Sequence, residues 1–254
     1  MKKANLLALL SLISLSALSQ EKKESKDFSI TEFNKLTIEV TTVNAKGIEP
    51  FSPGYYSSSY KFIENITYNS INIGARYMLS PTFGLRADFG YLNLTNGKRS
   101  KSLDYNMQIP TFGVQGVINV SRLFNVEKTF GRFGLLFHGG LQISQLYSRT
   151  PDEVSSIDPS ILVTSQNVGR KDNNLGIIFG FSPQFRLDDK LALISDVSLV
   201  NSLKQHFTWD GANSAPTNNL TGKLVSMSIG ITYSIGAQNK HGDWTEIPSK
   251  KLKN

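Results

Sequence analysis

Residues 71–94 of the chain read INIGARYMLSPTFGLRADFGYLNL, and they decide the fold class. Apolar side chains occupy every second position on both sides of Ser80-Pro81-Thr82, which indicates two strands joined by a short turn. The intervening positions carry glycines together with Arg76, Arg86 and Asp88. One face of this hairpin therefore suits hydrocarbon, and the other face holds charge.

Eight segments of the chain share this period of two, which is typical of strands with two different faces. They lie near Leu36–Asn44, Ser70–Leu79, Phe83–Leu94, Tyr105–Arg122, Phe130–Leu146, Leu175–Leu187, Leu191–Val200 and Lys223–Ile235. Long polar loops (45–69, 93–104, 147–174 and 201–222) alternate with short turns (80–82, 123–128 and 188–190). This order predicts an up-and-down meander with an even strand count, which can close so that no edge stays unpaired.

The polar face of these segments indicates which side of the barrel is outside. It is rich in glycine, glutamine and serine, and no lysine falls inside any predicted strand core. A lipocalin-like soluble barrel or a β-sandwich would also alternate, but a face in bulk water normally collects lysine and glutamate. Large apolar residues with aromatics near the strand ends are typical of a lipid-facing wall. We therefore predict an all-β fold, an eight-stranded antiparallel up-and-down transmembrane β-barrel, whose closure satisfies every backbone group.

The ends of the chain predict export and define the domains. Met1-Lys2-Lys3, an apolar run from Leu6 to Leu18 and Ser19 form the pattern of a cleaved signal peptide, residues 1–19. A flexible leader (20–35), the barrel (36–236) and a basic periplasmic tail (237–254) follow. The formal net charge of +7 includes Lys2 and Lys3 and gives no argument for nucleic acid. With no cysteine there are no disulfides. We expect the outer membrane of a Gram-negative bacterium.

Seven charged residues fall on the lumen face: Glu39, Arg76, Arg86, Asp88, Arg132, Arg186 and Asp196. They would form either a selectivity ring or a paired structural network, because unpaired buried charge is costly. We favour the network, since side chains nearly fill an eight-stranded barrel. Closing the hairpin at 80–82 places Arg76 nearly opposite Arg86, and like charges across a ladder need compensation. Glu39 and Asp88 are the predicted compensating carboxylates.

Histidine and serine positions bear on catalysis and metal binding. The three histidines, His138, His206 and His241, have no metal-ligand spacing, so we predict no metal and no cofactor. His138 and Ser144 would suit a lipase or acyltransferase, but serine catalysis also needs an oriented base and an oxyanion site. The sequence shows neither, and we predict a hydrogen-bonded lumen histidine rather than an enzyme.

The hairpin GARYMLSPTFGLRADFGY (residues 74–91) resembles the N-terminal barrel of OmpA-like outer-membrane proteins of the Bacteroidetes type. The last strand, SMSIGITYSIG (226–236), is similar to the C-terminal assembly signal of such barrels, carried here by Ser228, Gly230, Tyr233 and Ile235. KHGDW (240–244) looks like the junction to a peptidoglycan-binding domain in longer relatives. Only ten residues follow Trp244, so we do not expect cell-wall anchoring.

The function that follows is a structural role in envelope integrity, with four loops presented outside the cell. Alternatives are a narrow diffusion channel and a lipid-modifying barrel enzyme. The expected partners are outer-membrane lipids, the barrel-assembly machinery and an extracellular ligand of the long loops, but not nucleic acid, and the barrel is expected to be a monomer. The aromatic residues of the first long loop form either an adhesive patch or a self-packed loop: Phe51, Tyr55, Tyr56 and Tyr60.

Overall fold

The computed structural model describes residues 33–52, 54–55, 68–96, 102–124, 131–150, 171–212, 220–237 and 243–244. The chain divides into two compact units, residues 1–32 and 33–254, and the first lies wholly outside the described residues. The predicted signal peptide, most of the leader, His241 and most of the tail therefore also lie outside them. Within the described ranges, no helix is long and apolar enough to cross a membrane.

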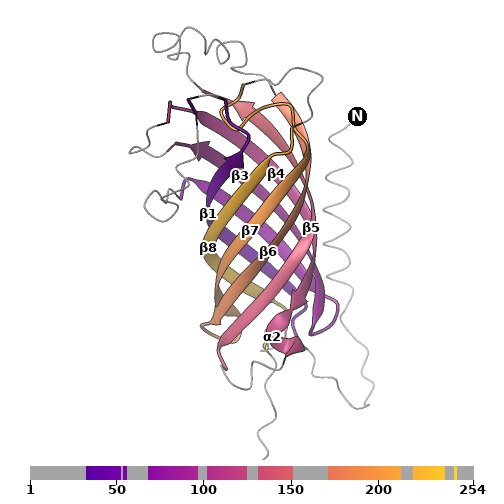
Figure 1. The fold of residues 1–254 in the computed structure, drawn as a ribbon. Coiled ribbons are helices and arrows are strands. Elements are labelled where there is room, and N and C mark those ends of the chain that lie inside the picture. The colour runs from indigo at the N-terminus through magenta and orange to yellow at the C-terminus, as the bar shows by residue number, and fades with distance from the viewer. Residues whose placement is uncertain are drawn as a thin grey trace, which may run out of the picture. The chain divides into compact units, whose positions relative to one another are not determined.

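The second unit is a closed barrel of eight antiparallel strands (Figure 1). Each strand pairs with its neighbours in the chain, and the first pairs with the last, so that no edge stays open. The predicted eight-stranded antiparallel barrel is confirmed. The strands are β1 (Leu36–Glu49), β2 (Ser70–Met78), β3 (Phe83–Thr95), β4 (Asn106–Asn119), β5 (Phe133–Ser148), β6 (Lys171–Arg186), β7 (Leu191–Lys204) and β8 (Lys223–Ile235).

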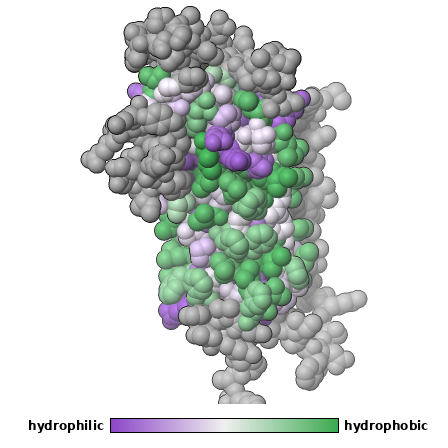
Figure 2. All heavy atoms as spheres, in the orientation of Figure 1, coloured by the Kyte–Doolittle hydropathy of each residue, from purple (hydrophilic) through white to green (hydrophobic). Residues whose placement is uncertain are grey.

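The apolar face of the strands points away from the barrel interior. Phe89 on β3, Leu141 on β5 and Ile231 on β8 are 57%, 54% and 48% exposed. Along β3 an exposed residue alternates with a buried one over most of the strand. Figure 2 shows the result on one side of the barrel, a wall that is mostly hydrophobic with hydrophilic residues toward its ends. The polar face accordingly lines the interior.

Strand boundaries differ from the prediction at both ends of the barrel. At the end that carries the long loops, the loop end, β6 begins at Lys171 and β7 continues to Lys204. Backbone pairing there extends past the apolar positions that marked the strands in the sequence. At the opposite end, the turn end, the predicted strand 105–122 stops at Asn119. The Asn119 side chain accepts a hydrogen bond from the Arg122 amide at 3.0 Å and caps the one-turn helix α2 (Val120–Leu123).

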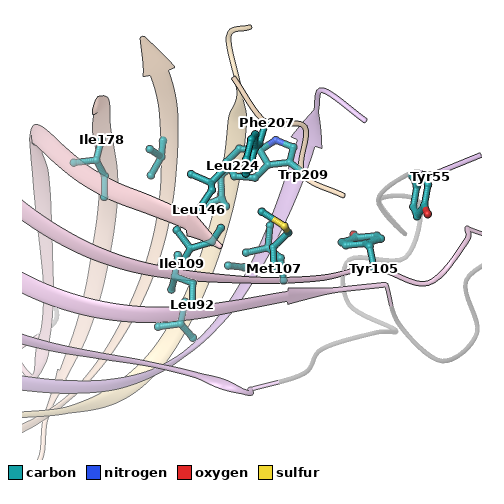
Figure 3. Packing of buried hydrophobic residues seen from close by; sticks show 14 residues of the cluster. Tyr55, Leu92, Tyr105, Met107, Ile109, Leu146, Ile178, Phe207, Trp209 and Leu224 are labelled. Atoms are coloured by element: carbon teal, nitrogen blue, oxygen red, sulfur yellow. The ribbon is translucent and has the colours of Figure 1, made fainter. Parts of the chain in front are cut away.

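The interior at the loop end holds a cluster of large apolar side chains, in addition to the glycine, glutamine and serine that the sequence analysis noted on the lumen face. We call this group the loop-end cluster (Figure 3): Val43, Ala45, Tyr55, Leu92, Leu94, Tyr105, Met107, Ile109, Leu146, Ile178, Val200, Phe207, Trp209 and Leu224. The segment after β7 contributes Phe207 and Trp209, and the Trp209 indole donates to the Glu49 carbonyl at 2.7 Å. Gly47 is required beside it, because a Cβ there would overlap the indole.

Further contacts fix this inward segment. The Asp172 carboxylate accepts from the backbone amides of His206 and Phe207 at 2.7 and 3.0 Å. The rings of Phe51 and Tyr55 both pack against Tyr105. The first long loop was expected to form either an adhesive patch or a self-packed loop. Phe51 and Tyr55 agree with the self-packed loop, while Tyr56 and Tyr60 lie outside the described residues. The loop-end mouth is therefore filled by the chain's own side chains.

Candidate functional site

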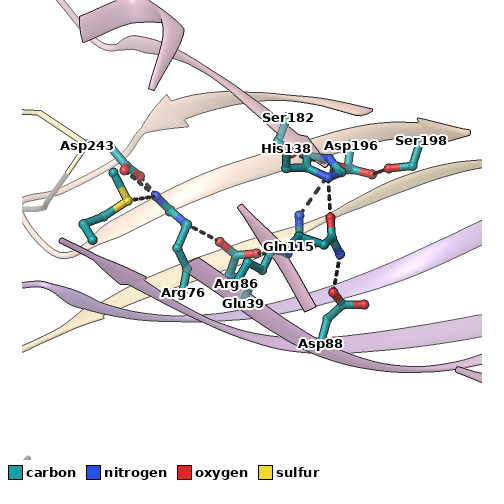
Figure 4. A network of polar contacts seen from close by, with 11 residues as sticks. Glu39, Arg76, Arg86, Asp88, Gln115, His138, Ser182, Asp196, Ser198 and Asp243 are labelled. Atoms are coloured by element: carbon teal, nitrogen blue, oxygen red, sulfur yellow. Dashed lines mark hydrogen bonds and ion pairs between the residues drawn. The ribbon is translucent and has the colours of Figure 1, made fainter. Parts of the chain in front are cut away.

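Two arginines face each other across the first hairpin, in the register that the sequence predicts. Arg76 on β2 is paired with Arg86 on β3, and both side chains are buried. The carboxylate of Glu39 on β1 lies between them (Figure 4). Arg76 Nε donates to Glu39 Oε1 at 2.8 Å, and Arg86 Nε lies 3.1 Å from Glu39 Oε2. One carboxylate thus bridges two cations that would otherwise destabilise the ladder.

A second carboxylate reaches Arg76 from beyond the last strand. Both terminal nitrogens of the Arg76 guanidinium donate to Asp243, with Nη2 at 2.8 Å from Oδ2. Asp243 and the adjacent Trp244 are 1% and 3% exposed. The Asp243 carbonyl accepts from the Asn119 side chain at 3.2 Å, and a Cβ at Gly134 would lie 3.0 Å from the Trp244 ring. These two residues, here called the C-terminal plug, fill the interior at the turn end.

The Asp196 carboxylate on β7 collects hydrogen bonds in the middle of the barrel. The hydroxyl groups of Ser182 and Ser198 both donate to it, the first at 2.6 Å. His138 Nε2 lies 2.7 Å from Asp196 Oδ2, and Arg86 Nη1 lies 3.7 Å from the same oxygen. Donors from several strands thus satisfy the oxygens of a carboxylate that would be costly to bury without partners.

His138 also connects Asp196 to Asp88 through an amide. The Gln115 side chain donates from its nitrogen to Asp88, so its oxygen faces His138 Nδ1 at 2.5 Å. On the other side of the ring, Nε2 contacts the Asp196 carboxylate. The imidazole thus lies between Gln115 and Asp196 and joins the two carboxylates into one set of polar contacts. We call the whole set the lumen network: Glu39, Arg76, Arg86, Asp88, Gln115, His138, Asp196 and Asp243.

A small cavity lies between the lumen network and the loop-end cluster. Its volume is about 40 Å³, and Arg86, Asp88 and His138 on one side and Ile178 and Leu224 on the other are among its lining residues. One water needs roughly 10–15 Å³ measured in this way, so the cavity has room for a few waters. Polar side chains on its wall can bind them.

The arrangement around His138 bears on the enzyme alternative. Serine catalysis needs a hydroxyl that donates to a base, yet Ser182 and Ser198, which contact the same carboxylate as His138, donate to Asp196. Ser144 faces Thr111 and Asn174 in the sheet, whereas His138 faces Val117 and Gly180. The structure therefore does not bring His138 and Ser144 together. Among the described residues, no group of three or more His, Asp or Glu is placed to hold a metal ion.

Two arginines expected in the lumen lie elsewhere. Arg132 is exposed in the turn before β5, and Arg186, at the end of β6, donates to Asp189 Oδ1 at 2.6 Å in the following turn. Their positions have the parity of lumen residues, but the wall ends there and the side chains reach water. The prediction for these two was wrong, whereas Glu39, Arg76, Arg86, Asp88 and Asp196 lie together.

Asp243 is the carboxylate of the lumen network that the sequence analysis missed, and Gln115 and His138 were also not among its predicted members. Strand periodicity carries no information on a segment after the last strand, and the basic composition of the tail predicted a solvated extension. A signal was present, because an acidic and an aromatic residue are adjacent in KHGDW. On β8, Ser228 is buried and Tyr233 and Ile235 are 50% and 45% exposed, so the predicted assembly signal presents its two hydrophobes outward.

Comparisons with known proteins give fold-level similarity only. No protein-family model matches the chain, and no curated protein matches its sequence. Solved structures that match include Neisserial surface protein A (10% identity, 79% of this chain and 97% of that one, TM-score 0.46). OprG from Pseudomonas aeruginosa matches at 9% identity over 81% and 98%, with a TM-score of 0.46. Ail of Yersinia pestis matches at 11% identity over 80% and 99%, with a TM-score of 0.39.

Proposed function

We propose that this chain is a non-enzymatic, OmpA-like barrel of the bacterial outer membrane, with a structural role in the envelope and four loops presented outside the cell. The observation that carries the proposal is the filling of the barrel at both ends. The C-terminal plug lies against Arg76 at one end, and the loop-end cluster closes the other. The cavity of about 40 Å³ between them has room for only a few waters. Such a filled interior supports a rigid structural barrel rather than a pore.

The outer wall supports the membrane location. Outward-facing Ile73, Phe89, Leu141, Phe181 and Ile231 are each about half exposed, on strands spread around the barrel. A contiguous apolar surface of this extent is rare on a soluble monomer, whereas a lipid-facing band requires it. The phrases in residues 74–91 that resemble OmpA-like barrels agree with this assignment. Lipids, the assembly machinery and a ligand of the outer loops are the proposed partners of a monomeric barrel.

Two measurements test the proposal. The unboiled protein, recovered in the outer-membrane fraction, should migrate differently from the boiled protein on a denaturing gel. In planar bilayers the wild-type protein should give no steady conductance. A stable channel in the wild type would replace this proposal with the narrow diffusion channel, and recovery in the soluble periplasm without a gel shift would refute the membrane location.

A matched pair of variants locates the seal. Trp244→Ala removes the larger part of the C-terminal plug and leaves every strand intact, so it should give brief or noisy conductance. Lys190→Ala, a change in the turn after β6 at the same end of the barrel, should give none. Equal silence in both variants would mean that the loop-end cluster alone closes the interior.

A further inference from the structure

We propose that Arg149, Lys171 and Tyr147 form a binding site for the phosphate group of an outer-leaflet lipid, on the outside of the barrel wall; the inference rests on the membrane orientation proposed above. Arg149 and Lys171 are exposed and lie at the loop end of β5 and β6. The Arg149 guanidinium lies 4.5 Å from the Tyr147 ring centroid, and Lys171 Nζ lies 5.9 Å from the same centroid. The Tyr147 ring thus makes cation–π contacts with both side chains and holds the two cations close together.

The register of β5 with β6 places this group at headgroup depth. Ile143 pairs with Leu175, both exposed and apolar. The next outward rung pairs Gln145 with Asn173, whose amides are hydrogen bonded at 2.8 Å. The rung above pairs Tyr147 with Lys171. Four residues of strand rise about 13 Å, which is roughly 10 Å along the membrane normal at the usual tilt.

From Ile143–Leu175 to Tyr147–Lys171, these successive residue pairs change from apolar to polar to charged, as the surroundings do across a membrane interface. The hydrocarbon core ends where apolar side chains end, and the headgroup region extends several ångströms beyond it. Tyrosine is favoured at that level, and the long arginine and lysine side chains can extend from it toward the headgroups. Phosphate groups occur there, and arginine binds phosphate with strong charge-assisted hydrogen bonds.

The part of the chain that the structure describes does not neutralise these two cations. Among the described residues, no carboxylate lies within ion-pair distance of Arg149 or Lys171. Asp172, next to Lys171 in the chain, points to the interior, where it is 6% exposed and accepts from two backbone amides. The outward charge therefore remains available for an anion, and the bilayer presents one at this depth.

Lipid retention tests the site. Purified protein in detergent is mixed with bisphosphorylated lipid A or with the same lipid after removal of its phosphates, and the bound lipid is counted by native mass spectrometry. Wild type should retain the phosphorylated lipid preferentially. Lys171→Gln should reduce this retention about threefold and Arg149→Gln/Lys171→Gln at least tenfold, whereas Lys190→Gln, which removes one charge at the turn end, should not change it.

Each other outcome overturns the inference. Equal retention of both lipids by wild type would assign the binding to the apolar wall. Competition by millimolar inorganic phosphate would indicate a site for free anions. Loss of retention in Lys190→Gln to the same extent would indicate net charge alone. An unchanged gel shift in all variants shows that the barrel is intact, so that failure of this site is distinguishable from failure of the membrane assignment.

Discussion

The contact between Arg76 and Asp243 makes a quantitative prediction. Asp243→Ala removes two charge-assisted hydrogen bonds from a guanidinium that is 0% exposed. Hydrogen bonds to charged groups contribute about 1.5–3 kcal/mol each, and stranding a buried charge costs about 3–5 kcal/mol. Arg76 keeps its hydrogen bond to Glu39 at 2.8 Å, so the lower limit of the cost of stranding a buried charge applies. We expect the free energy of unfolding to fall by about 3 kcal/mol.

A double-mutant cycle separates the ion pair from general damage to the barrel. Arg76→Met should also cost about 3 kcal/mol, because it strands Asp243. The double variant should cost less than the sum of the two by about 2 kcal/mol, since neither charge is then left alone. Urea unfolding in lipid vesicles, followed by tryptophan fluorescence and by the gel shift, measures all three variants.

The control is a surface ion pair in the same protein. Asp189→Ala breaks the ion pair with Arg186, in which the Asp189 side chain is 50% exposed and the Arg186 side chain is 24% exposed. This change should lower the free energy of unfolding by less than about 1 kcal/mol. If Asp243→Ala costs no more than this control, or if the cycle is additive within about 0.5 kcal/mol, the C-terminal plug does not stabilise the barrel.

Other parts of the barrel give three further predictions. Gly140→Ala should destabilise the barrel by more than about 2 kcal/mol, because its Cβ would overlap the backbone of β4. Gly116→Ala, whose Cβ would make only an ordinary contact of 3.8 Å with the Gly139 carbonyl oxygen, should cost at most about 1 kcal/mol by urea unfolding. His138→Leu should cost about 1–3 kcal/mol in the same assay, because it removes the ring contacts to the buried Gln115 and Asp196 side chains; an unchanged stability would show that these contacts do not stabilise the barrel. An epitope tag at Ser160 should be labelled on intact cells and one at Asp189 should not, and the reverse labelling would invert the orientation.

The sequence predicted the barrel because each strand of the wall turns alternate side chains to lipid and to the lumen. This alternation is visible directly in the sequence. A period of two over eight segments is sufficient for the topology, and the turn at 80–82 fixes the pairing of Arg76 with Arg86. The same reasoning placed Glu39 beside them, since β1 must neighbour β2 in a meander.

Three features could not be predicted in this way. Periodicity does not reveal where the wall ends, so Arg132 and Arg186 were assigned to the lumen. It does not describe loops, so the inward turn of Trp209 was missed. It gives no partner for a residue after the last strand, so Asp243 had no predicted place. In each case the deciding contact joins a strand to a segment without regular structure.

The two carboxylates that bind Arg76 come from opposite ends of the barrel sequence, Glu39 on the first strand and Asp243 beyond the last. Synthesis delivers them in that order, so full neutralisation of Arg76 requires that translation has passed residue 243. A product truncated after Ile235 has all eight strands but lacks the C-terminal plug at the turn end. Its Arg76 therefore lacks one of its two carboxylate partners. Such a product should be cleared faster by proteases than the finished protein, and the contact thereby distinguishes complete chains from incomplete ones.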